Sequence, residues 1–189
     1  MNPLPPEPPD LRAPRKWNWG LWVIAAIFVC FLCGIAAVGT YLYPRLLRLR
    51  AARANGLCIR RLHDCARAIS MYAADNDEAL PNASSWMDET RSLVRSERSF
   101  RCPEAWREGA GAYGYAMNAK LSRVPVGQID DAGATPLVFD STLLMRNAGG
   151  GTDTVPKKGR HRGGNNVACA DGHVEHVAGL FTSRPPRPL

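Results

Sequence analysis

The chain has 189 residues, a formal net charge of +7 and 46% hydrophobic residues. That length allows one compact domain with short appendages, since domains commonly run about 100–200 residues. The excess of basic residues suggests nucleic acid as a partner, but no nucleic-acid recognition motif accompanies the charge. Many of the arginines instead follow an apolar segment, where they suit anionic lipid head groups. The sequence therefore predicts membrane lipid, and not nucleic acid, as the partner of this charge.

Both ends of the chain are rich in proline and poor in residues that could build a core. Residues 1–16 contain six prolines (Pro3, Pro5, Pro6, Pro8, Pro9 and Pro14), and residues 183–189 read SRPPRPL. Such a composition favours polyproline-like or disordered chain. We predict a Pro-rich tail at each end, over residues 1–16 and 183–189.

Residues 17–44 predict a transmembrane helix. No charged residue lies between Lys16 and Arg45, and the run Leu21–Tyr43 is long enough to cross a hydrocarbon core, which needs about 20 apolar residues. A cleaved signal peptide has a shorter apolar region of about 7–15 residues. Aromatic side chains suited to the two head-group levels mark both ends of the run: Trp17, Trp19 and Trp22, then Tyr41 and Tyr43.

Two features of the sequence give opposite orientations in the membrane. Arginines are dense after the apolar run, and the positive-inside rule would then place the domain in the cytoplasm. Cys58, Cys65, Cys102 and Cys169 allow two disulfides, which are typical of an oxidising compartment, although buried free thiols explain them equally well. These residues alone do not decide on which side of the membrane the domain lies. If bridges exist, we favour a link from the helix with Cys58 and Cys65 to the Cys102 loop.

Residues 45–80 predict a soluble, amphipathic continuation of the helix. Pro44 closes the apolar run, and we expect a kink or a local break there. Apolar residues then recur at helical spacing and form one stripe: Cys58, Leu62, Cys65, Ile69 and Tyr72. The polar run Asp75–Glu78, followed by Pro81, is expected to end the helix.

Residues 81–182 predict a globular domain built on a small antiparallel sheet. Pro136–Asp140 has the composition of a buried strand, and the glycine-rich stretch 147–158 is expected to be a mobile loop. A long helix packed on a small antiparallel sheet is an α+β fold.

The clearest local signal is a hairpin near the C-terminus. Two strand-like runs, 166–170 and 173–177, are separated by Asp171 and Gly172, a pair that favours a type I′ turn. A turn of that type places Cys169 opposite Val174 and Val167 opposite His176.

The same segment resembles a known family signature. His161, nine further residues and then Asp171-Gly172 resemble the H-X9-DG signature of planctomycete-type pilin-like proteins, the DUF1559 group. Cys102-Pro103 and the segments 58–81, 113–118 and 139–141 resemble further landmarks of that group in the same order. The motif residues in this chain are His161, Gly163, Gly164, Asn165, Asp171, Gly172 and His173.

The resemblance implies a type IV pilin-like fold, similar to the major pseudopilins of type II secretion. Such proteins have a long N-terminal helix, half in the membrane, packed on a small antiparallel sheet. The resemblance further implies a single pass through the cytoplasmic (inner) membrane, with the domain on the extracytoplasmic side. A non-enzymatic role in cell-envelope structure, secretion or surface interaction follows, with other pilin-like or secretion-system proteins as partners.

One departure from the pilin pattern concerns the start of the helix. Pilins carry a Gly at the end of a short basic leader and a Glu at the fifth position after it. Here the nearest glycine is Gly20, the fifth residue after it is Ala25, and the span contains no Glu. We expect no processing by a prepilin peptidase, so the resemblance does not extend to filament assembly.

The alternative hypothesis is a membrane-tethered metal-binding sensor or enzyme that uses His161, Asp171 and His173. Histidine and carboxylate groups together can ligate divalent ions, and Asp140, Glu175 and His176 are further candidates. However, the predicted register separates His173 from His176, which favours a structural hydrogen bond for His161 and a turn role for Asp171. Calcium is the cation that the resemblance implies, with no ligands transferred.

No catalytic motif is evident in the chain. The sequence has no nucleotide loop, nucleophile elbow or metalloprotease helix. The sequence therefore predicts no enzyme, no cofactor and no small-molecule substrate.

Overall fold

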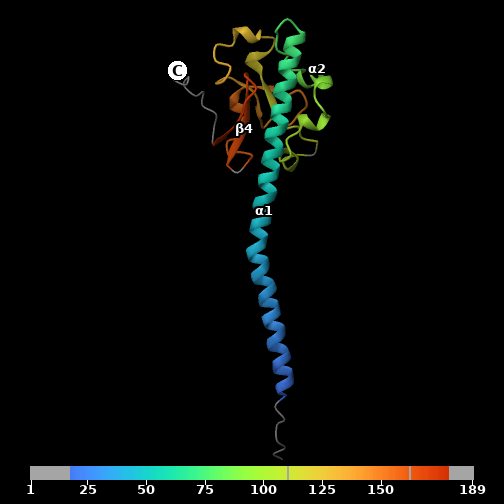
Figure 1. Ribbon diagram of the computed structural model, residues 1–189, viewed down its shortest axis with the longest axis vertical. Helices are drawn as coiled ribbons and strands as arrows, with labels where there is room; N and C mark the ends of the chain where they lie inside the picture. Colours follow the sequence, from blue (N-terminus) through green and yellow to red (C-terminus); the bar gives the residue numbers. More distant parts are fainter. Residues whose placement is uncertain (1–17, 110, 162, 179–189) are drawn as a thin grey trace, which may run out of the picture. The chain divides into compact units, whose positions relative to one another are not determined.

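The computed structural model describes residues 18–109, 111–161 and 163–178 (Figure 1). The chain divides into two compact units, Met1–Leu47 and Arg48–Leu189. The tails predicted for residues 1–16 and 183–189 lie outside the described residues.

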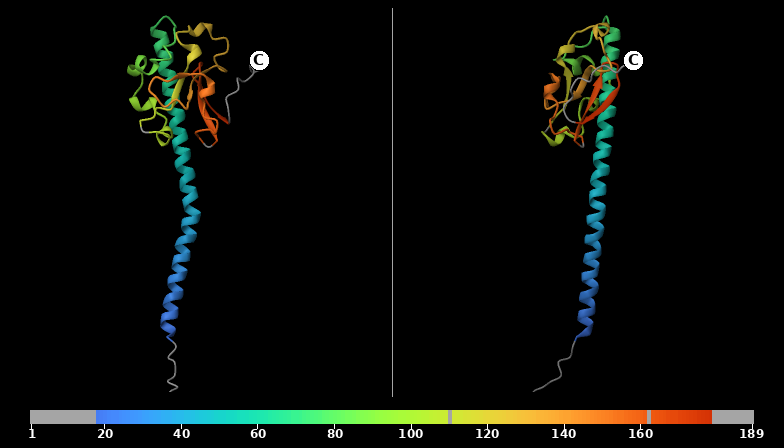
Figure 2. Two further views of the ribbon diagram at one scale, coloured as in Figure 1. Left: turned by 180° about the vertical axis from the view of Figure 1, so that it is seen from behind. Right: turned by 90° about the vertical axis from the view of Figure 1, so that its left-hand side faces the viewer.

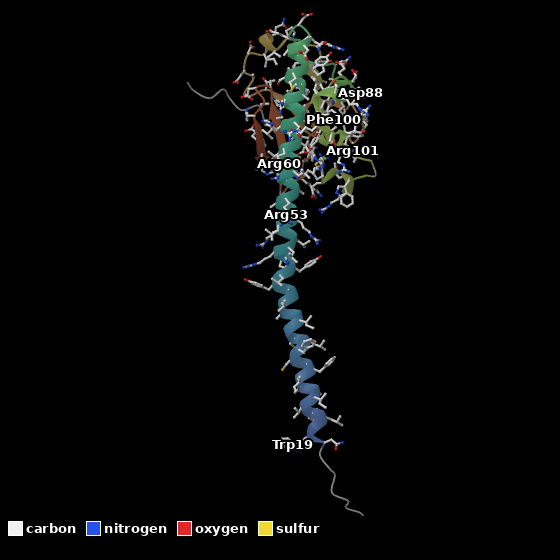
Figure 3. All side chains as sticks on the ribbon, turned by 45° about the vertical axis from the view of Figure 1, so that its right-hand side comes forward. Trp19, Arg53, Arg60, Asp88, Phe100 and Arg101 are labelled. Atoms are coloured by element: carbon white, nitrogen blue, oxygen red, sulfur yellow. The ribbon has the colours of Figure 1, made fainter. Side chains whose placement is uncertain are left out.

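Within the described part of the first unit, the chain is helical. Helix α1 (Trp19–Asp75) begins there and contains a window long and apolar enough to cross a membrane, none of which is buried. Its large apolar side chains, such as Ile27 and Phe28, are exposed. Trp19, also exposed, is labelled at the start of the helix in Figure 3. The local break expected at Pro44 is wrong, because α1 continues through it. A proline removes one helical hydrogen bond, and the bonds on either side are enough to continue the helix.

The second unit packs around the C-terminal part of α1. Cys58, Leu62, Cys65 and Ile69 are fully buried, as their spacing predicts, and Tyr72 is half-buried. The helix ends at Asp75, where the polar run begins. Figure 2 shows this part of α1 along one side of the domain.

The buried stripe of α1 lies in one large hydrophobic cluster with the sheet and the segment after the helix. From the sheet, this cluster includes Tyr115, Met117, Val138 and Ala168. Helix α2 (Trp86–Glu89) adds the fully buried Trp86. A second, smaller cluster contains the strand residues Ala116, Phe139, Val167 and Cys169 with Ala148 and Val155.

Within the described residues, five strands form one sheet in the order β3-β1-β2-β4-β5. The strands are β1 (Tyr115–Asn118), β2 (Pro136–Asp140), β3 (Gly149–Gly150), β4 (Gly164–Cys169) and β5 (Val174–Ala178). The strand predicted at Pro136–Asp140 is thus confirmed, and so is the α+β class.

The sheet is mixed and not purely antiparallel, because β3 pairs with β1 in parallel. The stretch 147–158, expected to be a loop, therefore contributes a short strand. A Cβ atom at Gly149 would lie 2.8 Å from the carbonyl oxygen of Ala83. Because glycine has no side chain, this segment can pass close to Ala83 where β3 pairs with β1 at the edge of the sheet.

The C-terminal hairpin is present, but its predicted register is wrong by one residue. Ala168 lies opposite Val174, and Val167 lies opposite Glu175. The amide of Gly172 donates to the oxygen of Cys169, and the amide of Cys169 donates to the oxygen of His173. Gly172 is the last residue of this turn, and its backbone has a left-handed conformation, with φ +90°. This is a three-residue connection with a glycine bulge, and the extra residue shifts the pairing.

The packing of α1 predicts unequal effects for two neighbouring leucines. Leu62→Ala, at a fully buried position, is expected to lower the free energy of unfolding by about 2–5 kcal/mol, because it leaves a cavity. Leu57→Ala, at a position that is 39% exposed, should change it by less than about 1 kcal/mol. Denaturant titration of the full chain in detergent compares them. Equal losses would contradict this account of the packing.

Candidate functional site

Four side chains that can ligate metals or transfer protons meet inside the domain. They are Cys58, Cys102, Asp140 and His161, and one ligand atom from each lies within 4.8 Å of the other three. All four are between 0 and 2% exposed. We call this set the buried ligand cluster.

Each member of the buried ligand cluster comes from a different segment. Cys58 lies on α1, and Cys102 lies just after the short 3-10 helix Glu97–Phe100. Asp140 is the last residue of β2. His161 lies before β4, where its amide and its carbonyl both bond to Gly164. The backbone amide of Cys102 donates to Tyr113 over 2.7 Å, which fixes the loop beside β1. The cluster therefore joins the helix to three segments of the domain.

The contacts within the buried ligand cluster are close. The Cys102 Sγ atom is 3.4 Å from Nε2 of His161. The same nitrogen is 3.4 Å from Oδ2 of Asp140. The Cys58 Sγ atom is 3.6 Å from Oδ1 of Asp140. The thiol sulfurs, the imidazole nitrogen and the carboxylate oxygens of the four residues are therefore within contact distance of one another.

A buried arginine balances the charge of Asp140. The Arg160 side chain is 1% exposed, and its Nη1 atom lies 3.4 Å from Oδ1 of Asp140. Arg160 also donates to the carbonyl oxygens of Gly114 and Ser141, both over 2.7 Å. Its Nε and Nη2 atoms bind both carboxylate oxygens of Glu108. Such bidentate pairing uses the planar guanidinium fork and fixes its orientation.

Hydrogen bonds from outside the buried ligand cluster hold two of its members. The Tyr115 hydroxyl donates to the Cys58 Sγ atom over 3.1 Å. The backbone amide of Asn166 donates to Oδ2 of Asp140 over 2.7 Å. The Asn166 side chain in turn donates to Asn55 on α1. These bonds orient the thiol and the carboxylate.

Burial and neighbouring charge shift the pKa values of the buried ligand cluster in different directions. Burial raises the pKa of Cys58. The hydrogen bond from Cys58 lowers the pKa of Cys102, burial opposes this, and the hydrogen bond from His161 lowers it further. Burial lowers the pKa of His161, but its bonds to Asp140 and Cys102 outweigh this and raise it to about 9. Because the pKa of Cys58 is raised and that of Cys102 is lowered, Cys102 is the thiol of the two that ionises more readily.

The structure separates the two halves of the H-X9-DG motif. His161 lies in the buried ligand cluster, whereas Asp171 lies in the exposed hairpin turn, where its Oδ1 atom accepts from the amide of His173 and lies 2.6 Å from Nδ1 of the same residue. The turn role expected for Asp171 is confirmed. His161, Asp171 and His173 therefore do not form one ligand set.

The remaining motif residues shape the backbone. Gly163 lies in the turn before β4 with φ +82°, and Gly164 begins the strand. The Asn165 side chain accepts from the amide of Arg160 and donates to the oxygen of Pro156. These residues hold the segment that carries Arg160 and His161.

A second group of metal-ligating atoms, from Cys169, His173 and Glu175, lies on the hairpin. His173 and Glu175 are only half-buried, and His173 already pairs with Asp171. This hairpin group is therefore less enclosed than the buried ligand cluster.

All six cysteines are free thiols in the structure. Of the four disulfide candidates, Cys58 and Cys102 lie together, as favoured for a link between the helix and the Cys102 loop. Cys65 instead donates to the oxygen of Ser99, and Cys169 lies on β4 in the smaller hydrophobic cluster.

Two surface pockets flank the domain core. One, of about 210 Å³, is lined by Cys102 together with Arg61, Arg98, Arg101 and Trp106. The other, of about 400 Å³, is mainly apolar, with Glu78 and Ser70 among its lining residues. The smaller pocket therefore reaches the Cys102 thiol, which lies 3.4 Å from Nε2 of His161, whereas the larger pocket is lined by neither a cysteine nor a histidine.

Sequence reasoning missed Arg160 and did not assign Cys58, Cys102 and Asp140 to one site. The usable signal was Asp140, an acid that ends a buried strand and so requires a cationic or hydrogen-bonding partner. Comparison of the chain with family models, characterised proteins and solved structures found no match.

The buried guanidinium predicts that lysine cannot replace Arg160. Arg160→Lys keeps the charge but loses the fork, so that one ammonium group must replace the bonds to Glu108, Asp140 and the Ser141 oxygen, and each buried acceptor left without a donor costs about 1–3 kcal/mol. We expect the free energy of unfolding to fall by at least about 2 kcal/mol in denaturant titration. Arg107→Lys, at a side chain that is 62% exposed, is the control and should be neutral. A neutral Arg160→Lys would show that the guanidinium network does not stabilise the domain.

Proposed function

We propose that the chain is a single-pass membrane-anchored protein whose pilin-like domain acts in cell-envelope structure, secretion or surface interaction, without catalytic activity. The observation that carries the proposal is the division of roles along α1. Its N-terminal part exposes an apolar surface long enough to cross a bilayer, and its C-terminal part is the buried spine of a small α+β domain. A pilin-type subunit requires that combination in one helix.

The basic stretch after the apolar run supports an anchor at a membrane surface. Arg45, Arg50 and Arg53 are exposed on α1, and Figure 3 marks Arg53 and Arg60 along the helix. Arginines immediately beyond a hydrocarbon core contact anionic head groups. We therefore propose lipid as one partner, with other pilin-like or secretion-system proteins as the protein partners.

The absence of catalysis is supported by the state of the most reactive groups. The members of the buried ligand cluster are at most 2% exposed and contact one another, although one of them, Cys102, also lines the smaller pocket. The larger pocket brings few polar groups to an apolar lining, whereas substrate sites place several polar groups on one ligand. The geometry thus favours a structural role for the domain.

Charges placed in the apolar run should release the protein from the membrane. The double variant Ile27→Arg, Ile35→Arg places two charges where each costs about 2.5–3.5 kcal/mol at a helix centre. We expect it to leave the carbonate-resistant membrane fraction that holds the wild type. The control, Trp106→Arg with Met145→Arg, changes two residues that are 65% and 63% exposed in the domain and should stay in that fraction. Wild-type protein in the soluble fraction would refute the anchor.

The proposed extracytoplasmic side predicts the labelling of an introduced thiol. In intact cells, a membrane-impermeant maleimide should label Met145→Cys, whose position is 63% exposed, and should not label Asn2→Cys. The wild type is the background control, because its domain cysteines are buried. Labelling of Asn2→Cys alone would place the domain in the cytoplasm and would reject the proposed role outside the cell membrane.

A further inference from the structure

We propose that the buried ligand cluster is a structural zinc site, in which Cys58, Cys102, Asp140 and His161 supply the four ligands of one ion. The site lies wholly within the second unit, so the inference does not depend on the membrane anchor or on the pilin-like role.

The spacing of the ligand atoms carries the proposal. Zinc bonds of about 2.3 Å to sulfur and about 2.0–2.2 Å to nitrogen or oxygen set tetrahedral ligand separations of about 3.3–3.8 Å. In the structure, the Nε2 atom of His161 lies 3.4 Å from Cys102 Sγ and 3.4 Å from Asp140 Oδ2, whereas Cys58 Sγ lies 3.6 Å from the other Asp140 oxygen, Oδ1. Two edges of the tetrahedron, which share the His161 nitrogen, are therefore already at the required length, and one ligand atom from each of the four residues lies within 4.8 Å of the others.

The ligand types select the class of metal. Two thiolates, an imidazole and a carboxylate form a mixed set of intermediate softness, which suits zinc. Calcium and magnesium take six or more oxygen ligands, or keep several waters, and sulfur is a poor ligand for both. The calcium that the family resemblance implies is thus a poor match for this cluster.

Charge and hydrogen bonding favour the bound state. The two thiolates and the carboxylate would carry three negative charges beside the dication and the Arg160 guanidinium, which also pairs with the partly exposed Glu108. The Tyr115 hydroxyl on Cys58 and the Asn166 amide on Asp140 supply the outer hydrogen bonds that orient metal ligands.

Four protein ligands leave no open position, which distinguishes a structural site from a catalytic one. Cys58 is the first residue of the buried stripe on α1, and the other ligands come from three separate segments. One ion would therefore fasten the helix to the domain at the point where its buried face begins.

The first test is metal analysis of the full chain, purified in detergent with a reductant and without chelator. We expect one zinc ion per chain, and a lower thermal midpoint after chelation that zinc restores. The variants Cys102→Ser and His161→Gln should lose the ion. The matched control is Cys65→Ser, at another fully buried thiol on the same stripe of α1, and it should retain the ion.

Cobalt(II) substitution of the wild type gives a test that needs no variant to fold. Tetrahedral cobalt with thiolate ligands has strong visible absorption and a thiolate charge-transfer band, which we expect at one equivalent and also in Cys65→Ser. Wild-type protein that lacks zinc and shows no such spectrum overturns the proposal. So does zinc retained by His161→Gln, or a Cys58–Cys102 disulfide that resists the reductant and blocks binding.

Discussion

A carboxylate that is removed from water must be paired, because an isolated buried charge costs several kcal/mol. Asp140 is fully buried at the end of β2 and contacts Arg160, His161, Cys58 and the amide of Asn166. The helix, the strand β4 and the segment before that strand are therefore positioned around one group. Most of the other residues of the H-X9-DG motif, by contrast, shape the turns on either side of β4.

About 140 residues is an ordinary size for a single domain with its own hydrophobic core. Here the helix contributes both the stripe that fills the larger hydrophobic cluster and a thiol at the start of that stripe. A membrane anchor, a packing surface and a cross-linking group would then share one continuous helix.

Local sequence patterns predicted the long helix and the strands well. They could not predict contacts between residues that lie far apart in the sequence. The stripe Cys58–Ile69 and the strand Pro136–Asp140 follow from periodicity and composition alone, and both are as expected. The hairpin register failed because Gly172 closes a three-residue connection in place of a two-residue turn. The strand at Gly149–Gly150 pairs with Met117 and Asn118 of β1, and the buried ligand cluster joins residues from four distant segments. No window of sequence contains either contact.

The bond between Asn55 and Asn166 joins residues 111 positions apart. During synthesis the ribosome therefore completes the apolar stripe of α1 long before it adds β4 and β5, which are needed to finish the sheet. Until the last strands emerge, the stripe has no complete surface to cover it. A chain that ended before β4 would lack Ala168 of the larger hydrophobic cluster and Val167 and Cys169 of the smaller one, and the apolar surface left exposed would favour aggregation.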